Sequence, residues 1–181
     1  MFESLKGMVK ISEENEKSLA DVVLDAEVAT SGMPIDDIRE KMHARLKVMQ
    51  QSAQAGLERP IKSISGISGG SAHKFWGWLD GNQPVTGSVL SRAVARALAV
   101  NEVNAGMGCI VATPTAGSAG ILPATMITLQ ETYDFSDDEV VDALFTASGI
   151  GMVVVNRANV SGAMGGCPAE TGSAAAVAGG A

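Results

Sequence analysis

Aromatic side chains are scarce in this sequence of 181 residues, at 4% of the chain, whereas glycine occurs 21 times. Apolar residues still make up 46%, which is enough for a core in a single domain of this length. Small side chains let helices approach one another closely. The composition therefore predicts tightly packed helices or glycine-rich turns, above all in the second half.

Positively charged residues are also few. The chain has 13 lysines and arginines and 20 acidic residues, so its net charge is −7. Nucleic-acid phosphates would be repelled, and no basic patch offsets the deficit. No apolar run has the length of a signal peptide or a membrane span. The cysteines, Cys109 and Cys167, are too few for a disulfide scaffold. We expect a cytoplasmic protein with reduced thiols that binds neither nucleic acid nor membrane.

One segment has almost no charge. Between Ala97 and Gln130 the only charged residue is Glu102, although charged residues make up 18% of the chain. Within this segment Asn101–Pro123 reads NEVNAGMGCIVATPTAGSAGILP, and its polar centre is unlike a core. Pro114 removes a backbone donor and disfavours helix at the residue before it. Because buried polar groups need partners and this loop has no obvious internal acceptors, we expect an enclosed site.

Hydrophobic periodicity predicts helices through the first third of the chain. Ser12 is the predicted N-cap of a helix that ends at the turn before Pro34, and Pro34 is suited to open the next helix. The second helix carries an apolar stripe up to Gly56. Residues 1–58 are therefore predicted to form an amphipathic helical hairpin, and 59–181 to form site-bearing helices and loops.

The remaining pattern is also helical. Helices are predicted at 88–101, at 122–131, after the capping box Ser136–Glu139, and at 150–155, although the last of these is β-branched. No βαβ alternation or internal repeat is present. The predicted fold class is mainly α, a compact helical domain with glycine-rich active-site loops.

The last residues, AETGSAAAVAGGA, keep helix-like spacing without a cap or a charged tail. Such a pattern is typical of a flexible terminus or of a polypeptide cut inside a larger domain. We expect the second, because apolar residues seldom finish a solvated tail.

Several residues are candidates for chemistry. Cys167 follows the glycine-rich stretch SGAMGG, which lets the backbone approach a bulky group, and its thiolate can ligate iron or zinc. The plainer interpretation is a small buried apolar residue. His73 and Lys74 follow the turn Ser68-Gly69-Gly70, whose N–H groups can face an anion at a helix start, although such turns are also common in plain loops.

Glu102 has two interpretations as well. Burial without a partner would suit a general acid or base, whereas the alternative is a carboxylate that caps backbone or pairs with Arg92 or Arg96. The remaining histidine, His43, is predicted to be a surface residue. Trp76 and Trp78 are predicted to be packing residues rather than a stacking platform.

Three motifs together identify a known family. The blocks NEVNAGMGCIVATPTAGSAGILP, NVSGAMGGCPAETGSA and SGISGGSAHK resemble the alpha chain of iron-sulfur-dependent L-serine dehydratases, also called L-serine ammonia-lyases. The likeness runs from Met1 over the whole chain. It implies a mainly helical lyase of amino-acid degradation and gluconeogenesis that converts L-serine to pyruvate and ammonia. It also implies a [4Fe–4S] cluster held by three cysteines, a beta chain or beta domain as partner, and a homo- or hetero-oligomer.

The resemblance assigns Cys167 as the first cluster ligand. The other two family ligands, in a Cys-Asp-Pro and a Pro-Cys element, do not occur in this sequence, so the resemblance indicates the N-terminal portion of an alpha chain and an isolated fragment without activity. Pro168 stands where the family usually has Gln, which puts a polar contact of that side chain in doubt. Cys109 has no ligand counterpart.

The family chemistry requires removal of a weakly acidic α-proton and departure of hydroxide. An iron with an open coordination position can act as a Lewis acid on the hydroxyl, and hydrogen-bond donors can stabilise the charge that develops. The candidate bases, in no firm order, are Lys74, His73 and Glu102. The predicted substrate-binding residues are Ser68, Gly69, Gly70, Asn101, Asn104, Thr113, Thr115, Ala116, Gly117 and Ser118.

Two alternatives stay open at this point. One is a cysteine-desulfidase-like lyase on a related domain, and the other is an inactive helical module. Lys74 beside a Ser-Gly-Gly turn resembles a Schiff-base lysine with a phosphate loop. A pyridoxal-phosphate enzyme is nevertheless disfavoured, because the sequence lacks the α/β pattern expected of such an enzyme.

Overall fold

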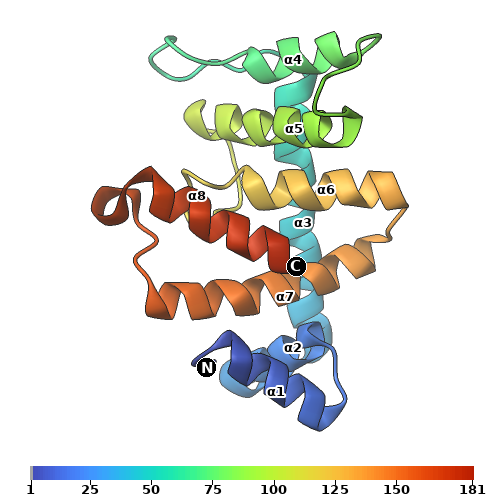
Figure 1. Cartoon of the computed structure of the whole chain (residues 1–181), viewed down its shortest axis with the longest axis vertical. Helices are drawn as coiled ribbons and strands as arrows, with labels where there is room; N and C mark the ends of the chain where they lie inside the picture. Colours follow the sequence, from blue (N-terminus) through green and yellow to red (C-terminus); the bar gives the residue numbers. More distant parts are fainter. Residues whose placement is uncertain (1) are drawn as a thin grey trace. The chain divides into compact units, whose positions relative to one another are not determined.

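The structure is a computed structural model that describes residues 2–181, so Met1, where the family resemblance begins, lies outside the described residues. The described chain forms eight helices and no strand, apart from an isolated antiparallel bridge between Lys62 and Gly69 (Figure 1). The predicted mainly α class is confirmed. The helices are α1 (Leu5–Asn15), α2 (Leu19–Ser31), α3 (Ile35–Glu58), α4 (Ser71–Leu79), α5 (Ser88–Ala105), α6 (Ile121–Tyr133), α7 (Asp137–Arg157) and α8 (Gly162–Gly180).

The chain divides into two compact units. The terminal unit comprises the residues up to Arg45 together with Ser136–Ala181, and the central unit comprises Leu46–Phe135. The first part of α3 therefore belongs to the terminal unit and its second part to the central unit. No helix within residues 2–181 is long and apolar enough to cross a membrane.

The N-terminal region contains two helices where the sequence predicted one. Ser4 caps α1 and Ser18 caps α2, each accepting a backbone N–H at 3.1 Å. The predicted cap, Ser12, is wrong, because it lies inside α1. The chain breaks at Glu16, which adopts a left-handed φ of 51°. Glu13 and Glu14, which would form an acidic first turn after a cap at Ser12, lie at the end of α1 instead.

Close helix packing builds the terminal unit. Helix α7 packs against α2 on one side and α8 on another. A Cβ added at Gly149 of α7 would lie 2.4 Å from Val23 Cγ2 and 2.9 Å from Met8 Cε. Neighbouring Leu144 and Phe145 are buried. Glycine at position 149 therefore lets α7 approach the first two helices.

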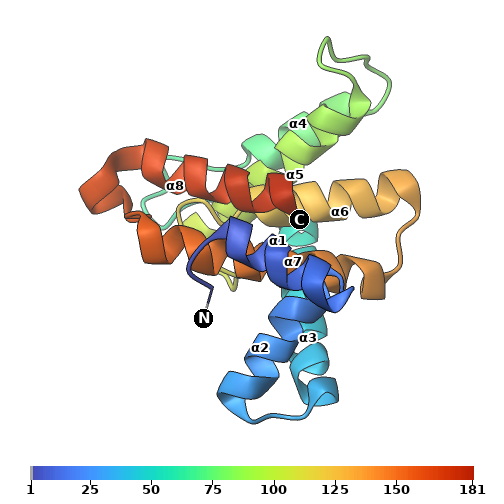
Figure 2. The same ribbon diagram turned by 60° about the horizontal axis from the view of Figure 1, so that its bottom comes forward.

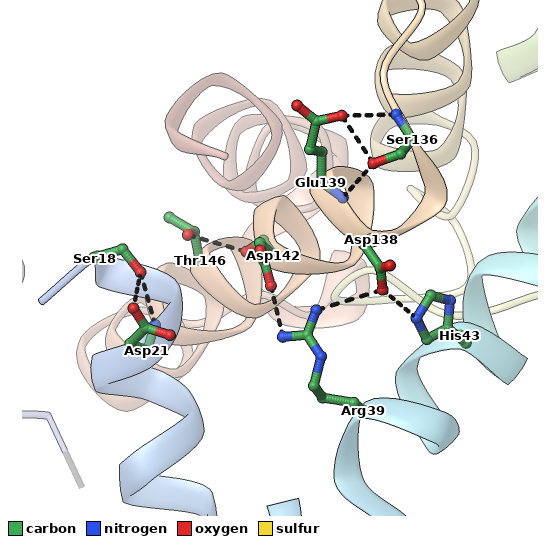
Figure 3. A network of polar contacts seen from close by, with 9 residues as sticks. All are labelled: Ser18, Asp21, Arg39, His43, Ser136, Asp138, Glu139, Asp142 and Thr146. Carbon is green, nitrogen blue, oxygen red and sulfur yellow. Dashed lines mark hydrogen bonds and ion pairs between the residues drawn. The ribbon is translucent and has the colours of Figure 1, made fainter. Parts of the chain in front are cut away.

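A polar network joins the first part of α3 to α7 (Figure 3). Arg39 Nη1 donates to Asp142 Oδ1 at 2.7 Å, and Arg39 Nη2 lies 3.6 Å from Asp138 Oδ1. His43 Nε2 lies 3.0 Å from the same Asp138 oxygen. The hydrogen bond to Asp142 raises the pKa of the Arg39 guanidinium. The histidine predicted to lie at the surface thus contacts a carboxylate of the next packed helix.

The capping box predicted at the start of α7 is confirmed. Glu139 N donates to Ser136 Oγ, and Ser136 N donates back to Glu139 Oε2 at 2.8 Å (Figure 3). The backbone and hydroxyl hydrogen bonds from Ser136 lower the pKa of the Glu139 carboxyl. Helix α7 continues through 150–155, as predicted, so the β-branched residues there do not form a strand.

The central unit stacks α4, α5 and α6 in chain order, with the second part of α3 crossing them (Figure 1). Ala53 of α3 shares a buried cluster with α5 and α6, and Leu57 shares another with α4 and α5. At Gly56, an added Cβ would lie 2.7 Å from Ala99 of α5. Small side chains at the crossing therefore allow the two backbones to approach closely.

Candidate active site

The low-charge segment Asn101–Pro123 forms the last turn of α5, a tight turn, a loop and the start of α6. Met107 adopts a left-handed φ of 63°, and Gly108 N donates to Val103 O at 2.8 Å. A Cβ at Gly108 would lie 2.5 Å from Val103 Cγ1, so glycine is required for this close turn. The chain then leaves α5 and enters the predicted substrate loop.

Hydrogen bonds hold the loop from inside. Ser118 is buried, and its Oγ donates to Thr113 O at 3.2 Å and lies 3.0 Å from Thr115 Oγ1. Asn104 Nδ2, on the last turn of α5, donates to Ala116 O at 3.1 Å. The expectation that this loop lacks internal acceptors is therefore wrong, because its own carbonyl oxygens accept from Ser118 and Asn104.

Two buried atoms remain without a hydrogen-bond partner in the part of the chain that the structure describes. They are Thr113 Oγ1 and Glu102 Oε2, and both lie in the segment that stood out for its lack of charge. An unsatisfied buried polar atom costs about 1–3 kcal/mol. A catalytic or ligand-binding role is one explanation for such atoms, and it agrees with the interpretation of this segment as part of a site.

The turn before α4 is shaped by glycine. Gly69 and Gly70 have φ values of 114° and 83°, and a Cβ at Gly69 would lie 2.0 Å from Ile61 O. Ser68 closes the turn, since its carbonyl oxygen accepts from Ser63 N at 3.0 Å. The carbonyl oxygen of Ile61 leaves no room for a side chain at Gly69. The left-handed φ values also favour glycine at both positions.

An acidic side chain of the protein occupies the helix start that follows this turn. The N–H groups of Ser71 and Ala72 donate to Glu102 Oε1 at 2.7 Å and 3.3 Å. These N–H groups were expected to face a ligand anion, and in the structure they bind the carboxylate of Glu102. Of the two interpretations of Glu102, capping of backbone is the one observed.

The other two candidate bases lie on α4. His73 is half-buried, and its Nδ1 lies 2.7 Å from Leu57 O at the end of α3. A carbonyl oxygen can only accept, so the proton of the neutral ring is on Nδ1 and the lone pair on Nε2. Lys74 is exposed.

The arginines of α5 do not pair with Glu102. Arg96 is buried, donating to Thr128 Oγ1 at 2.9 Å and to Glu131 Oε2. The guanidinium carbons of Arg92 and Arg96 lie 5.0 Å and 5.1 Å from the Trp76 ring centroid. This stack was not predicted from the sequence, although the spacing of four residues places both arginines on one helix face.

The remaining predicted substrate residues are exposed. They are Asn101 on α5 and, in the loop, Ala116 and Gly117. Exposed loop amides are open to a ligand. In the central unit, the last turn of α5 thus contacts the start of α4 through Glu102 and the Thr113–Ser118 loop through Asn104.

The predicted metal ligand lies in the terminal unit. Helix α8 changes direction at Gly166, which has φ 71° and ψ 177°, and Cys167 follows this bend (Figure 2). The cysteine is exposed, and its carbonyl oxygen accepts from Thr171 Oγ1 at 2.9 Å. The sulfur belongs to the first turn of the second helical segment, where the helix dipole favours a negatively charged ligand. The interpretation of this cysteine as a buried apolar residue is wrong.

A [4Fe–4S] cluster needs several thiolate ligands, and the chain has two cysteines. Cys109 is also exposed, on the loop after α5 in the central unit. No group of three or more His, Cys, Asp or Glu side chains suited to a metal ion occurs within residues 2–181. Cys167 therefore fits one position of a cluster, and the other ligands would have to come from further polypeptide.

Comparisons with known proteins agree on one family. The profile of the family described as serine dehydratase alpha chain matches residues 14–181. The chain is 39% identical over 178 residues to the probable L-serine dehydratase alpha chain of Bacillus subtilis, and 35% identical over 178 residues to the L-serine dehydratase alpha chain of Peptoniphilus asaccharolyticus. It is 29% identical over 187 residues to the L-serine dehydratase of Haemophilus influenzae.

These matches cover most of the chain but only part of each relative. Each alignment includes 98% of this chain, and it covers 59% of the Bacillus protein, 61% of the Peptoniphilus protein and 40% of the Haemophilus protein. The chain thus spans about 40% to 60% of the length of these relatives.

Proposed function

This chain belongs to the serine dehydratase alpha chain family, and on that premise we propose that it is part of an L-serine ammonia-lyase. The reaction removes the α-proton and the β-hydroxyl group of L-serine as water. The resulting aminoacrylate tautomerises to an imine, which takes up water and releases ammonia to give pyruvate. The observation that carries the proposal is that the last turn of α5 binds both the start of α4, directly after the motif Ser68–Gly70, and the motif Thr113–Ser118.

The loop and the turn bind the substrate in this proposal. The exposed amides of Ala116 and Gly117 and the hydroxyl groups of Thr113 and Thr115 are donors for the substrate carboxylate. Negative charge grows there as the α-carbon loses its proton, so fixed donors lower the barrier. The unpartnered Thr113 Oγ1 supports this role, because a ligand atom would satisfy it.

His73 is the general base in this proposal. Its Nδ1–H is bound to Leu57 O, which orients the ring and leaves the Nε2 lone pair to take the α-proton. Glu102 is a poorer candidate, since one carboxylate oxygen accepts two N–H groups and the other is buried. Lys74 is exposed, and its side chain makes no orienting hydrogen bond within residues 2–181.

Cys167 is one ligand of a [4Fe–4S] cluster in this proposal, with the remaining ligands supplied by sequence beyond its 181 residues. The exposed sulfur after the bend of α8 supports this assignment. When bound, the cluster supplies a Lewis acid for the departing hydroxyl group. The printed names of two relatives, both L-serine dehydratase alpha chains, support a further polypeptide or domain, the beta part, as partner.

The experiment that tests this function starts from the native complex. An affinity tag on this chain is used to purify it anaerobically from its own cells with every subunit that copurifies. Pyruvate formation from L-serine and sulfide release from L-cysteine are then measured side by side. We expect pyruvate from L-serine to dominate, and faster sulfide release from L-cysteine would favour a cysteine desulfidase instead.

The isolated chain provides a second measurement. Anaerobic incubation with iron and sulfide, followed by iron and sulfide analysis, is expected to show no stoichiometric cluster on the 181 residues alone. A stable [4Fe–4S] cluster on the isolated chain would contradict the proposal that other polypeptide completes the ligand set.

A further inference from the structure

The last turn of α5 carries two polar side chains that reach separate elements. Glu102 and Asn104 are two positions apart, which is about 200° around a helix. Glu102 binds the N-terminus of α4, and Asn104 binds the carbonyl oxygen of Ala116 in the substrate loop. One helical turn therefore contacts both predicted substrate elements, from nearly opposite sides.

Helix α4 depends on this contact for its cap. Its N-cap residue is Gly70, which has no side chain and makes no side-chain cap hydrogen bond. Glu102, which lies 31 residues after Ser71 in the sequence, is the hydrogen-bond acceptor for Ser71 N and Ala72 N. A carboxylate at this position also meets the positive end of the helix dipole.

The same end of α5 also holds the segment that leads into the turn. Ile64 N donates to Ala105 O at 3.3 Å. A Cβ at Gly106 would lie 2.8 Å from Ile61 Cγ2 and 3.2 Å from Lys62 O. Residues 61–64, which precede the turn, thus contact the end of α5.

The geometry of Glu102 argues against proton transfer by this residue. Oε1 already accepts from two N–H groups, and Oε2 is buried from solvent. A general base needs a lone pair within reach of the substrate proton. What the side chain can do is fix where α4 begins, and with it His73, two residues after the first bound N–H.

We propose that Glu102 is a positioning residue that sets the Ser68–Gly70 turn and His73 at a fixed distance from the Thr113–Ser118 loop, with Asn104 as the opposite arm. The inference rests on the proposed serine ammonia-lyase function. A misplacement of about 1 Å can reduce a rate about 100-fold, so the length of the side chain at position 102 matters more than its charge.

The test compares Glu102→Gln with Glu102→Asp in the native complex and in the 181-residue chain. Gln keeps an acceptor at the Oε1 position, whereas Asp is one methylene shorter and withdraws it. We expect Glu102→Gln to keep kcat and KM for L-serine within about fivefold of the native complex, and Glu102→Asp to lose about 10- to 100-fold in kcat/KM. Glu40→Gln, an exposed residue of the terminal unit, controls for the loss of one charge.

Two further readouts separate positioning from acid–base catalysis. Amide hydrogen exchange of Ser71 and Ala72 in the 181-residue chain is expected to stay slow with Glu102→Gln and to accelerate with Glu102→Asp. The pH profile of kcat in the Glu102→Gln complex is expected to keep its titrating limbs. A lost limb, or an active Asp variant beside an inactive Gln variant, would overturn the proposal in favour of a titrating Glu102.

Asn104→Ala tests the opposite arm in case the Glu102 variants fold poorly. We expect a loss of about tenfold or more in kcat/KM with no change in Ser71 and Ala72 exchange. Unchanged kinetics in this variant and in Glu102→Asp would overturn the proposal. If the native complex forms no pyruvate from L-serine, the proposed function fails, whereas exchange at Ser71 and Ala72 still reports whether Glu102 holds α4.

Discussion

At the residue scale, the position of the ring proton of His73 determines which of its nitrogens can act as a base. The ring donates from Nδ1 to Leu57 O, so its base is Nε2. Asparagine can retain the first contact, because its Nδ2 occupies nearly the place of Nδ1, while it has no basic nitrogen. A substitution to asparagine can therefore remove the proposed base, Nε2, while the hydrogen bond to Leu57 O is kept.

We predict that His73→Asn in the native complex lowers kcat for pyruvate formation by about 10²- to 10⁴-fold, the usual contribution of a general base. The thermal midpoint should stay close to that of the native protein, because the contact with Leu57 is kept. The matched control is His43→Asn in the terminal unit, which should leave kcat unchanged. Equal losses in both variants would argue against His73 as the base.

Glu139 predicts a pH dependence of stability. The backbone N–H of Ser136, and then its hydroxyl, lower the pKa of Glu139 below its ordinary value of 4.5. A lowered pKa in the folded state stabilises the protein above the unfolded pKa, and this effect is lost as the pH falls through the folded pKa. The Tm difference between the native chain and Glu139→Gln should thus shrink from pH 6 to pH 3 in circular dichroism melts. A constant difference would contradict this.

Most candidate site residues were proposed from the sequence because a motif contained them. The loop at Thr113 and the exposed thiol of Cys167 stood out by their local composition. Capping of backbone was one of the two roles expected of Glu102, but its partner was not foreseen, because Glu102 binds α4 across about thirty residues of sequence. The contact of Leu57 was not foreseen either, because Leu57 acts through its backbone carbonyl. Such pairs depend on how helices pack, which no local pattern records.

At the scale of elements, caps and breaks decided which helices were predictable. The capping box at Ser136–Glu139 and the opening of α3 after Pro34 follow from local chemistry, and both occur as expected. The break between α1 and α2 does not follow from it. Glu16 adopts a left-handed backbone without glycine, and the acidic run around it has the composition of a helix start.

The crossing of α3 and α5 gives a packing prediction. Gly56→Ala would place its Cβ 2.7 Å from the Ala99 backbone, so we expect a loss of about 1–3 kcal/mol in the free energy of unfolding. Gly77→Ala, inside α4 with no atom within 4 Å of the new Cβ, should gain about 0.5–1 kcal/mol. Urea denaturation of both variants measures this difference, and equal midpoints would refute close packing at Gly56.

At the scale of the whole molecule, the proposed function assigns one cluster ligand, Cys167, to these 181 residues. We predict that Cys167→Ser lowers the iron and sulfide content of the anaerobically purified native complex severalfold, since a thiolate ligand is lost. Cys109→Ser should leave both contents unchanged, because the family resemblance gives that cysteine no ligand role. Full iron content in Cys167→Ser would contradict the assignment.

Family and fold class were the most predictable features at this scale. The three motif blocks indicated the family before any coordinates, and the periodicity indicated a mainly α chain. The division into a terminal and a central unit, with its border inside α3, was not expected. The amphipathic pattern is continuous along α3, so it does not indicate that the two parts of this helix belong to different units.

The exposure of both thiols has a practical consequence for handling the protein. Cys109 and Cys167 are accessible to solvent, and a thiol in that situation is open to air oxidation and to disulfide formation between molecules. Covalent dimers formed on storage would mimic a native assembly in gel filtration. Sizing of this chain is therefore best performed anaerobically or with reductant, and beside a Cys109→Ser, Cys167→Ser double variant.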